Sequence, residues 1–98
     1  MKFRSIKGTY DVLPDVSNKW KSIESYIHKN LNRAGYNEIR TPIFENTELF
    51  KRSVGLDSDV VSKEMYSWID QGGTDLTLKP EYTASVVRSY IQNNLGAS

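Results

Sequence analysis

Two side chains that could bind a small cationic ligand stand close together near the carboxyl end of the chain. They are Glu81 and Thr83, in the segment Leu-Thr-Leu-Lys-Pro-Glu-Tyr-Thr, where an alternating pattern meets a helical one. A carboxylate accepts charge-assisted hydrogen bonds from an ammonium group, about twice as strong as neutral ones, and the hydroxyl supplies a second oxygen. The same residue types cap helices by accepting hydrogen bonds from free backbone N–H groups. Spacing alone favours capping, and ligand binding stays open beside it.

Other residue types that support chemistry form no recognisable pattern. The single histidine, His28, has no second histidine and no cysteine with which to hold a metal, so we predict no metal site. Gly72 and Gly73 fit a hairpin turn, because the Gly-x-x-x-x-Gly-Lys pattern for phosphate is missing. Without a Ser–His–Asp set or a strong carboxylate pair, we predict no catalytic residue within this chain. Four basic residues are candidate phosphate contacts, although such side chains usually form a solvated face: Arg40, Lys51, Arg52 and Lys63.

The strongest structural pattern is a long amphipathic helix in the first half of the chain. Apolar residues recur there every three or four positions, which is the period of one helix face. Asp15 or Ser17 could cap the start of this helix, and Gly35 is a natural stop. The face is most simply part of a core, although it could instead contact a second subunit, and periodicity does not separate the two. Its residues are Trp20, Ile23, Ile27, Leu31 and Ala34.

Extended segments are expected on both sides of this helix. Residues 3–6 predict a short strand within an otherwise irregular entry, and residues 36–44 predict a longer extended run. Pro42 cannot donate a hydrogen bond to a neighbouring strand, so it must lie at a sheet edge, a bulge or a strand end. Asn46 or Thr47 then caps a short helix.

That short helix is expected to run through Val54 and to end at Gly55, followed by a polar loop over residues 56–63. Residues 64–70 and 75–79 alternate between polar and apolar types, and a turn joins them, which predicts an antiparallel hairpin.

A second helix is predicted over residues 80–95, with Pro80 and Glu81 suited to its first turn. The order helix, strand, short helix, hairpin, helix indicates an α+β fold with antiparallel strands. One face of this second helix is expected to carry Ala84, Val87, Ile91 and Leu95.

Composition limits the class of protein. A chain of 98 residues makes at most one small domain. With 13 basic and 12 acidic residues, its charge balance does not indicate a general nucleic-acid or membrane surface. It has no cysteine, no secretory signal pattern and no apolar run near the roughly 20 residues of a membrane span. We therefore expect a soluble, cytoplasmic protein.

Several segments, in the right order and spacing, resemble one known family over nearly the whole chain. Residues 7–14 are similar to the opening signature of histidyl-tRNA synthetases, and residues 20–42 resemble class II motif 1, a long helix followed by a strand that ends in proline. Residues 49–55 and 59–66 are also close to family sequences. The segment of residues 76–84 is similar to the family's Leu-Arg-Pro-Glu-Gly-Thr-Ala.

This resemblance implies the antiparallel-sheet catalytic fold of class II aminoacyl-tRNA synthetases. The family enzyme activates histidine with ATP and Mg²⁺ to histidyl-adenylate and then transfers the histidyl group to tRNA(His). Glu81 and Thr83 would bind the α-amino group of histidine. Motif 1 would form a homodimer interface, for which we name Trp20, Ile27, Leu31 and Pro42.

The chain departs from the family pattern at two positions, and several motifs of the family would come after its last residue. Tyr82 stands where the family usually has glycine, and Lys79 replaces an arginine, which keeps the charge and loses the planar fork. The motif 2 and motif 3 arginines, the histidine-specific loop and the anticodon-binding domain would all follow Ser98. We therefore expect residues 1–98 to be a single partial domain, inactive by itself and holding no ATP or Mg²⁺ alone.

Three alternatives are weighed against this interpretation. A regulatory paralogue of histidine biosynthesis shares the fold and motif 1, although the segment around Glu81 favours the synthetase. A non-enzymatic dimerisation module would use only the long amphipathic helix. A small nucleic-acid-binding domain is poorly supported by a net charge of +1.

Overall fold

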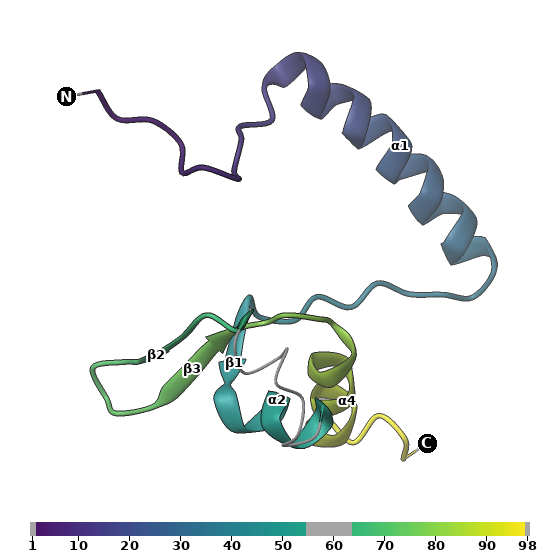
Figure 1. The fold of residues 1–98 in the computed structure, drawn as a ribbon. Coiled ribbons are helices and arrows are strands. Elements are labelled where there is room, and N and C mark those ends of the chain that lie inside the picture. Colours follow the sequence, from purple (N-terminus) through teal and green to yellow (C-terminus); the bar gives the residue numbers. More distant parts are fainter. Residues whose placement is uncertain (1, 55–63, 98) are drawn as a thin grey trace. The chain divides into compact units, whose positions relative to one another are not determined.

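A computed structural model describes residues 2–54 and 64–97. The chain divides into two compact units, Met1–Glu38 and Ile39–Ser98, each of which is described by itself. Figure 1 labels the helices and strands in chain order. The end of the short helix at Gly55, the polar loop over residues 56–63 and the candidate phosphate contact Lys63 lie outside the described residues.

The first unit contains one long helix, α1, which spans Pro14–Arg33 and confirms the predicted helix. It begins earlier than expected, with Pro14 at its first position, where a missing N–H costs nothing. Leu13 is the residue before it and no side chain caps the end, so the caps predicted at Asp15 or Ser17 are wrong. Gly35 follows the helix with φ of +90°, a conformation that glycine adopts without strain.

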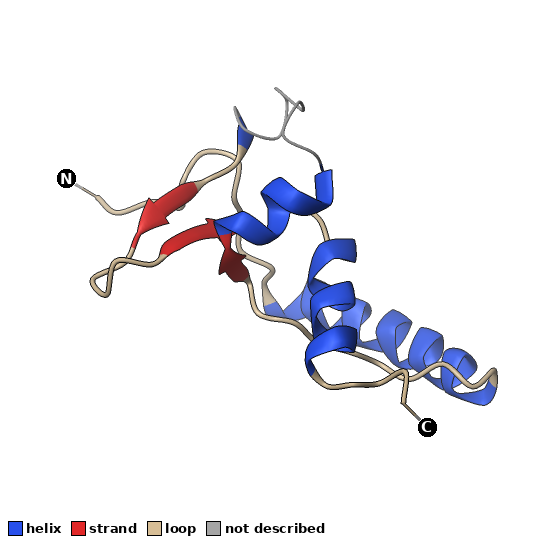
Figure 2. Ribbon diagram, turned by 90° about the horizontal axis from the view of Figure 1, so that it is seen from below, coloured by secondary structure: helices blue, strands red, loops and turns tan. Residues whose placement is uncertain are grey.

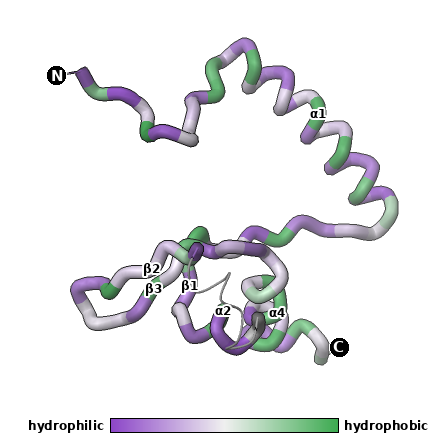
Figure 3. Tube along the Cα trace, viewed as in Figure 1, coloured by the Kyte–Doolittle hydropathy of each residue, from purple (hydrophilic) through white to green (hydrophobic). Residues whose placement is uncertain are grey.

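Two other expectations for the first unit fail. Residues 3–6 form no strand; a turn in which the Thr9 N–H donates to the Ile6 carbonyl follows them instead. No residue of α1 is buried, and Trp20 and Ile27 remain 53% and 46% exposed. Within the first unit this apolar face therefore forms no core. Figure 3 shows the hydrophobic positions recurring along α1.

The second unit is built on three short antiparallel strands in the order β1-β3-β2. β1 spans Phe44–Asn46, β2 Ser67–Ile69 and β3 Asp75–Leu78. The pairing of β2 with β3 confirms the predicted hairpin, and β1 pairs with the other edge of β3. Most of the extended run at residues 36–44 precedes β1, so Pro42 lies just before a strand, as its missing donor requires.

Two helices complete the second unit. α2 spans Thr47–Val54, packs against β1, β3 and α4 (Figure 2), and contributes the fully buried Phe50. Its start confirms one of the two predicted caps, since the Asn46 Oδ1 accepts the N–H of Glu48 at 3.0 Å. The resulting arrangement of helices with a small antiparallel sheet confirms the α+β class.

The last helix, α4, spans Thr83–Gln92 and is shorter than predicted. Pro80 and Glu81 precede it and are not part of its first turn, because Tyr82 is the residue before the helix. Of the four residues predicted to share one apolar face, only Ala84 is buried. The residues buried in α4 are Ala84 and Ser85, whereas Val87, Ile91 and Leu95 are 51%, 70% and 58% exposed.

The face of the sheet that the helices cover is polar. Thr77 is fully buried, and its hydroxyl lies 2.7 Å from the hydroxyls of both Thr47 and Ser67. Nearby, the Arg88 Nε on α4 contacts the Glu45 carboxylate on β1 at 2.9 Å. These bonds satisfy groups that would be costly to bury alone, and they tie both helices to the sheet.

The opposite face of the sheet carries apolar side chains. Phe44 and Leu78 are paired across β1 and β3, and the rings of Phe44 and Trp68 meet edge to face with centroids 5.7 Å apart. All three residues remain about two-fifths exposed. The alternation of side chains along each strand therefore places the polar set under the helices and the apolar set outside.

Candidate functional site

The carboxylate of Glu81 lies between the end of β3 and the start of α4. Its Oε2 accepts the backbone N–H of Thr83 at 2.6 Å, and its Oε1 accepts that of Ala84 at 3.1 Å. These two N–H groups belong to the first turn of α4, where backbone N–H groups have no acceptor within the helix itself. The capping role is therefore confirmed, and the side chain is held in one orientation by two bonds.

Capping leaves Glu81 able to bind a ligand. A carboxylate has about four lone-pair positions, and the helix uses a part of them. Glu81 is half-buried, and Thr83, the first residue of α4, is exposed. Within the described part of the chain the Thr83 hydroxyl makes no hydrogen bond. A fixed carboxylate two residues before an exposed threonine is suited to a ligand that carries an ammonium group.

Tyr82 and Lys79 flank Glu81. The ring centroid of Tyr82 lies 4.3 Å from the Lys79 Nζ, which is a cation–π distance. Lys79 also donates to Thr41, at 3.1 Å to the hydroxyl and 3.3 Å to the carbonyl oxygen. In the sequence, both residues are recognisable only as departures from a family pattern, which does not indicate that their side chains are in contact.

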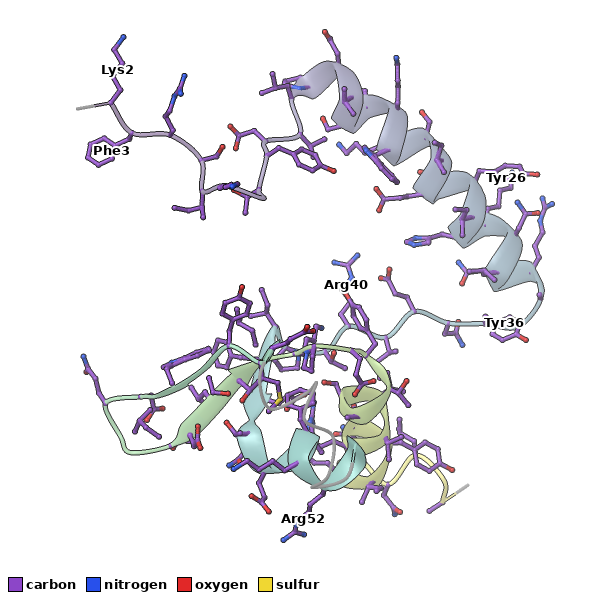
Figure 4. All side chains as sticks on the ribbon, in the orientation of Figure 1. Lys2, Phe3, Tyr26, Tyr36, Arg40 and Arg52 are labelled. Carbon is purple, nitrogen blue, oxygen red and sulfur yellow. The ribbon has the colours of Figure 1, made fainter. Side chains whose placement is uncertain are left out.

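The basic residues proposed as phosphate contacts are not brought together. The Arg52 Nε lies 3.5 Å from the Oε1 of Glu48, one turn earlier on α2, and both side chains are largely exposed. Figure 4 shows Arg40 and Arg52 on opposite sides of the second unit. Lys51 is exposed on α2. The described residues thus supply no phosphate cluster, and a shared phosphate site at these positions is not supported.

His28 has a partner within the first unit. Its Nε2 lies 3.3 Å from the Oε2 of Glu38, with both side chains about half exposed. Among the described residues, no group of three or more histidine, cysteine, aspartate or glutamate side chains could hold a metal.

The residues expected at a subunit interface lie in both units. Trp20, Ile27 and Leu31 share the exposed apolar face of α1. Pro42 belongs to the second unit and is exposed. None of the helices in the described ranges has the length and apolar character needed to cross a membrane.

Sequence reasoning missed the buried polar residues that hold β1, β3 and α4 together. Glu45 and Arg88 are 43 positions apart, and nothing local in either segment indicates the pairing. Thr77 stood in an alternating strand, a pattern that shows which residues share a face without showing which face is covered. The only available signal was a set of hydroxyl and carboxylate residues at alternate positions.

Comparisons with known proteins relate the chain to one group. A family described as histidyl-tRNA synthetase matches residues 8–96. The chain is 54% identical to the histidine–tRNA ligase of Lactobacillus johnsonii over 95 residues, which are 97% of the chain and 22% of that relative. It superposes on the apo histidyl-tRNA synthetase of S. aureus with a TM-score of 0.82 and 40% identity, covering 99% of this chain and 22% of that one.

A further solved structure carries a mixed description. It is an ATP phosphoribosyltransferase regulatory subunit/histidyl-tRNA synthetase from Bacillus halodurans, with a TM-score of 0.78 and 26% identity, and the match covers all of this chain and 25% of that one. The chain therefore spans about a fifth to a quarter of the length of these relatives.

Proposed function

Because the chain belongs to the histidyl-tRNA synthetase family, we propose that it supplies the amino-terminal part of the catalytic domain of a histidine–tRNA ligase. The family match over nearly the whole chain carries this proposal. The complete ligase joins histidine to tRNA(His) and uses ATP with Mg²⁺ to activate the amino acid, and we expect it to act in the cytoplasm. Since the chain spans 22% of its relatives' length, the ATP-binding groups are expected from the rest of that ligase.

Within this chain we assign Glu81 and Thr83 to the α-amino group of histidine. The two amide bonds that Glu81 accepts from α4 fix its carboxylate before the ligand arrives, so little side-chain entropy is lost on binding. The Thr83 hydroxyl supplies a neutral acceptor beside it. Together they would hold the amino acid by its ammonium group and leave its carboxylate unbound by these two residues.

A chimera tests this assignment. In it, the chain replaces the matching segment of the S. aureus synthetase, and we expect histidine-dependent ATP–pyrophosphate exchange. Glu81→Gln keeps an acceptor for the helix and removes the charge, so the KM for histidine should rise about tenfold or more while the KM for ATP stays unchanged. Glu48→Gln, at an exposed glutamate of α2, is the matched control. A folded chimera without exchange activity contradicts the ligase assignment.

The chain by itself is expected to be inactive. The purified 98-residue protein should give no histidine-dependent exchange above a no-enzyme blank, because it spans only 22% of the length of the related ligase. Exchange activity that copurifies with the chain and is lost in its Glu81→Gln variant would show that this expectation is wrong.

We also propose that motif 1 makes this protein a homodimer, through Trp20, Ile27, Leu31 and Pro42. The support is the exposed apolar face of α1, since about half of each of its large side chains faces solvent. Burying apolar surface contributes about 25 cal/mol for each Å² removed from water, so a second copy is a favourable partner for such a face.

Sedimentation of the chain over a range of concentrations measures this association. Ile27→Lys places a charge in the apolar face and should shift the protein to monomer. Ser22→Lys adds the same charge on the opposite, exposed side of α1 and should leave the association unchanged. A chain that stays monomeric at millimolar concentration, or two variants that behave alike, argues against the interface.

The regulatory-subunit alternative rests on the weaker resemblance to the Bacillus halodurans protein. Identity of 54% to a histidine–tRNA ligase against 26% to that protein favours the ligase. A chimera that binds histidine and does not exchange pyrophosphate would favour the regulatory role instead.

A further inference from the structure

The ammonium group of Lys79 is held away from the nearby glutamate. Lys79 is the basic residue closest to Glu81 along the chain, and its positive charge is attracted to the carboxylate when the two groups approach each other. Among the described residues the structure gives Lys79 no ion pair with Glu81. Its Nζ instead donates to the hydroxyl and carbonyl oxygens of Thr41 and lies over the ring of Tyr82.

Tyr82 occupies its position without strain. Its φ of −96° and ψ of −28° lie in the right-handed helical region, which any residue adopts. The glycine usual in the family is therefore not required by the backbone here. Tyr82 is 69% exposed, so burial does not explain its presence. Within the described chain, the aromatic ring makes a single cation–π contact, with the Lys79 ammonium.

We propose that Tyr82 is a positioning residue that keeps the Lys79 ammonium off the Glu81 carboxylate, so that Glu81 stays free to bind the ammonium group of a ligand. The identity of that ligand as histidine rests on the proposed function. The mechanism is competition between two cations for one anion. A cation–π contact and two hydrogen bonds to Thr41 satisfy the first cation, and the anion is left with only its two neutral amide donors.

A double variant distinguishes the positioning role of Tyr82 from a merely structural one. Tyr82→Leu removes the ring and releases Lys79 to compete for Glu81. Tyr82→Phe keeps the π face and should behave as the parent chain. If Lys79→Met is added to Tyr82→Leu, the competing charge is gone and the Glu81 site should recover. A ring that only supports the turn predicts that the double variant is at least as impaired as Tyr82→Leu.

NMR of the 98-residue chain tests the charge diversion without any catalysis. The ring current of Tyr82 should move the Lys79 ε-methylene protons upfield in the parent chain and in Tyr82→Phe, and not in Tyr82→Leu. In Tyr82→Leu the Thr83 and Ala84 amide protons should shift upfield, because Lys79 draws the carboxylate from them. In the double variant they should return. An unshifted Lys79 in the parent chain, or amides that fail to return, overturns the proposal.

Kinetics of the chimera test the consequence for the ligand. The KM for histidine should rise about two- to fivefold in Tyr82→Leu, the range that one exposed cation–π contact supports, and recover in the double variant. An unchanged KM in an active chimera overturns the positioning role while the ligase assignment stands. An inactive chimera with the expected NMR result refutes the ligase assignment alone.

Discussion

The ion pair between Glu45 and Arg88 offers a sharp test of how the second unit is held together. The Arg88 Nε lies 2.9 Å from one oxygen of Glu45 and 3.1 Å from the other. The two side chains are 8% and 27% exposed, so the carboxylate is buried and the guanidinium is partly solvated. We expect the loss of either partner to have unequal effects.

The magnitude follows from distance and burial. At 2.9 Å and an effective dielectric constant of about 20, the Coulomb attraction is about 6 kcal/mol before desolvation is subtracted. Arg88→Met leaves the buried Glu45 carboxylate without its cation and should cost about 3 kcal/mol of unfolding free energy, the low end for a broken buried pair. Glu45→Gln leaves Arg88 with solvent and the Gln92 Oε1 at 2.7 Å, so it should cost only about 1 to 2 kcal/mol.

Urea unfolding of the 98-residue chain, followed by circular dichroism, measures these values. The double variant Glu45→Gln, Arg88→Met should be less impaired than the sum of the single ones by about 1 kcal/mol or more. Gln92→Ala, which removes only the exposed contact of Arg88, is the control and should change stability by less than about 0.5 kcal/mol. If Glu45→Gln proves as costly as Arg88→Met, or if the two effects simply add, the burial argument is wrong.

Three further predictions concern the same unit and the same unfolding assay. Thr77→Val removes a fully buried hydroxyl that contacts Thr47 and Ser67, and it should lower the free energy of unfolding by about 1 to 3 kcal/mol. Thr74→Val, at an exposed position, should change stability little, and equal effects of the two variants would contradict the buried network. Gly73→Ala should lower the free energy of unfolding by about 1 to 2 kcal/mol, because Gly73 has a φ of +87°. In Gly72→Ala the new Cβ lies at an ordinary 3.5 Å from Asp70, so this control should be nearly neutral. A tolerated Gly73→Ala would rule out the positive φ. Asn46→Ala removes the cap of α2 and should cost about 1 kcal/mol, and Asn46→Asp should retain most of that stability.

Elements with local signals could be predicted from the amino-acid sequence. The period of Trp20, Ile23, Ile27 and Leu31 predicts α1, and alternation with a glycine turn predicts the β2–β3 hairpin, because both patterns arise from side chains only a few positions apart. The family resemblance, likewise, follows from ordered segments and needs no coordinates. The start of α1 and the limits of α4 were less well determined, since helix ends depend on single bonds such as those of Glu81.

Which surfaces are covered depends on the packing of the helices against the sheet, and this became evident only in three dimensions. Alternation along β3 separates Thr77 from Leu78, but the position of α2 and α4 makes the polar side the buried one. The Glu45–Arg88 and Lys79–Thr41 contacts join residues 43 and 38 positions apart. Such pairs form because packing brings distant backbone segments together and buried polar groups must then find partners, a condition that no short stretch of sequence records.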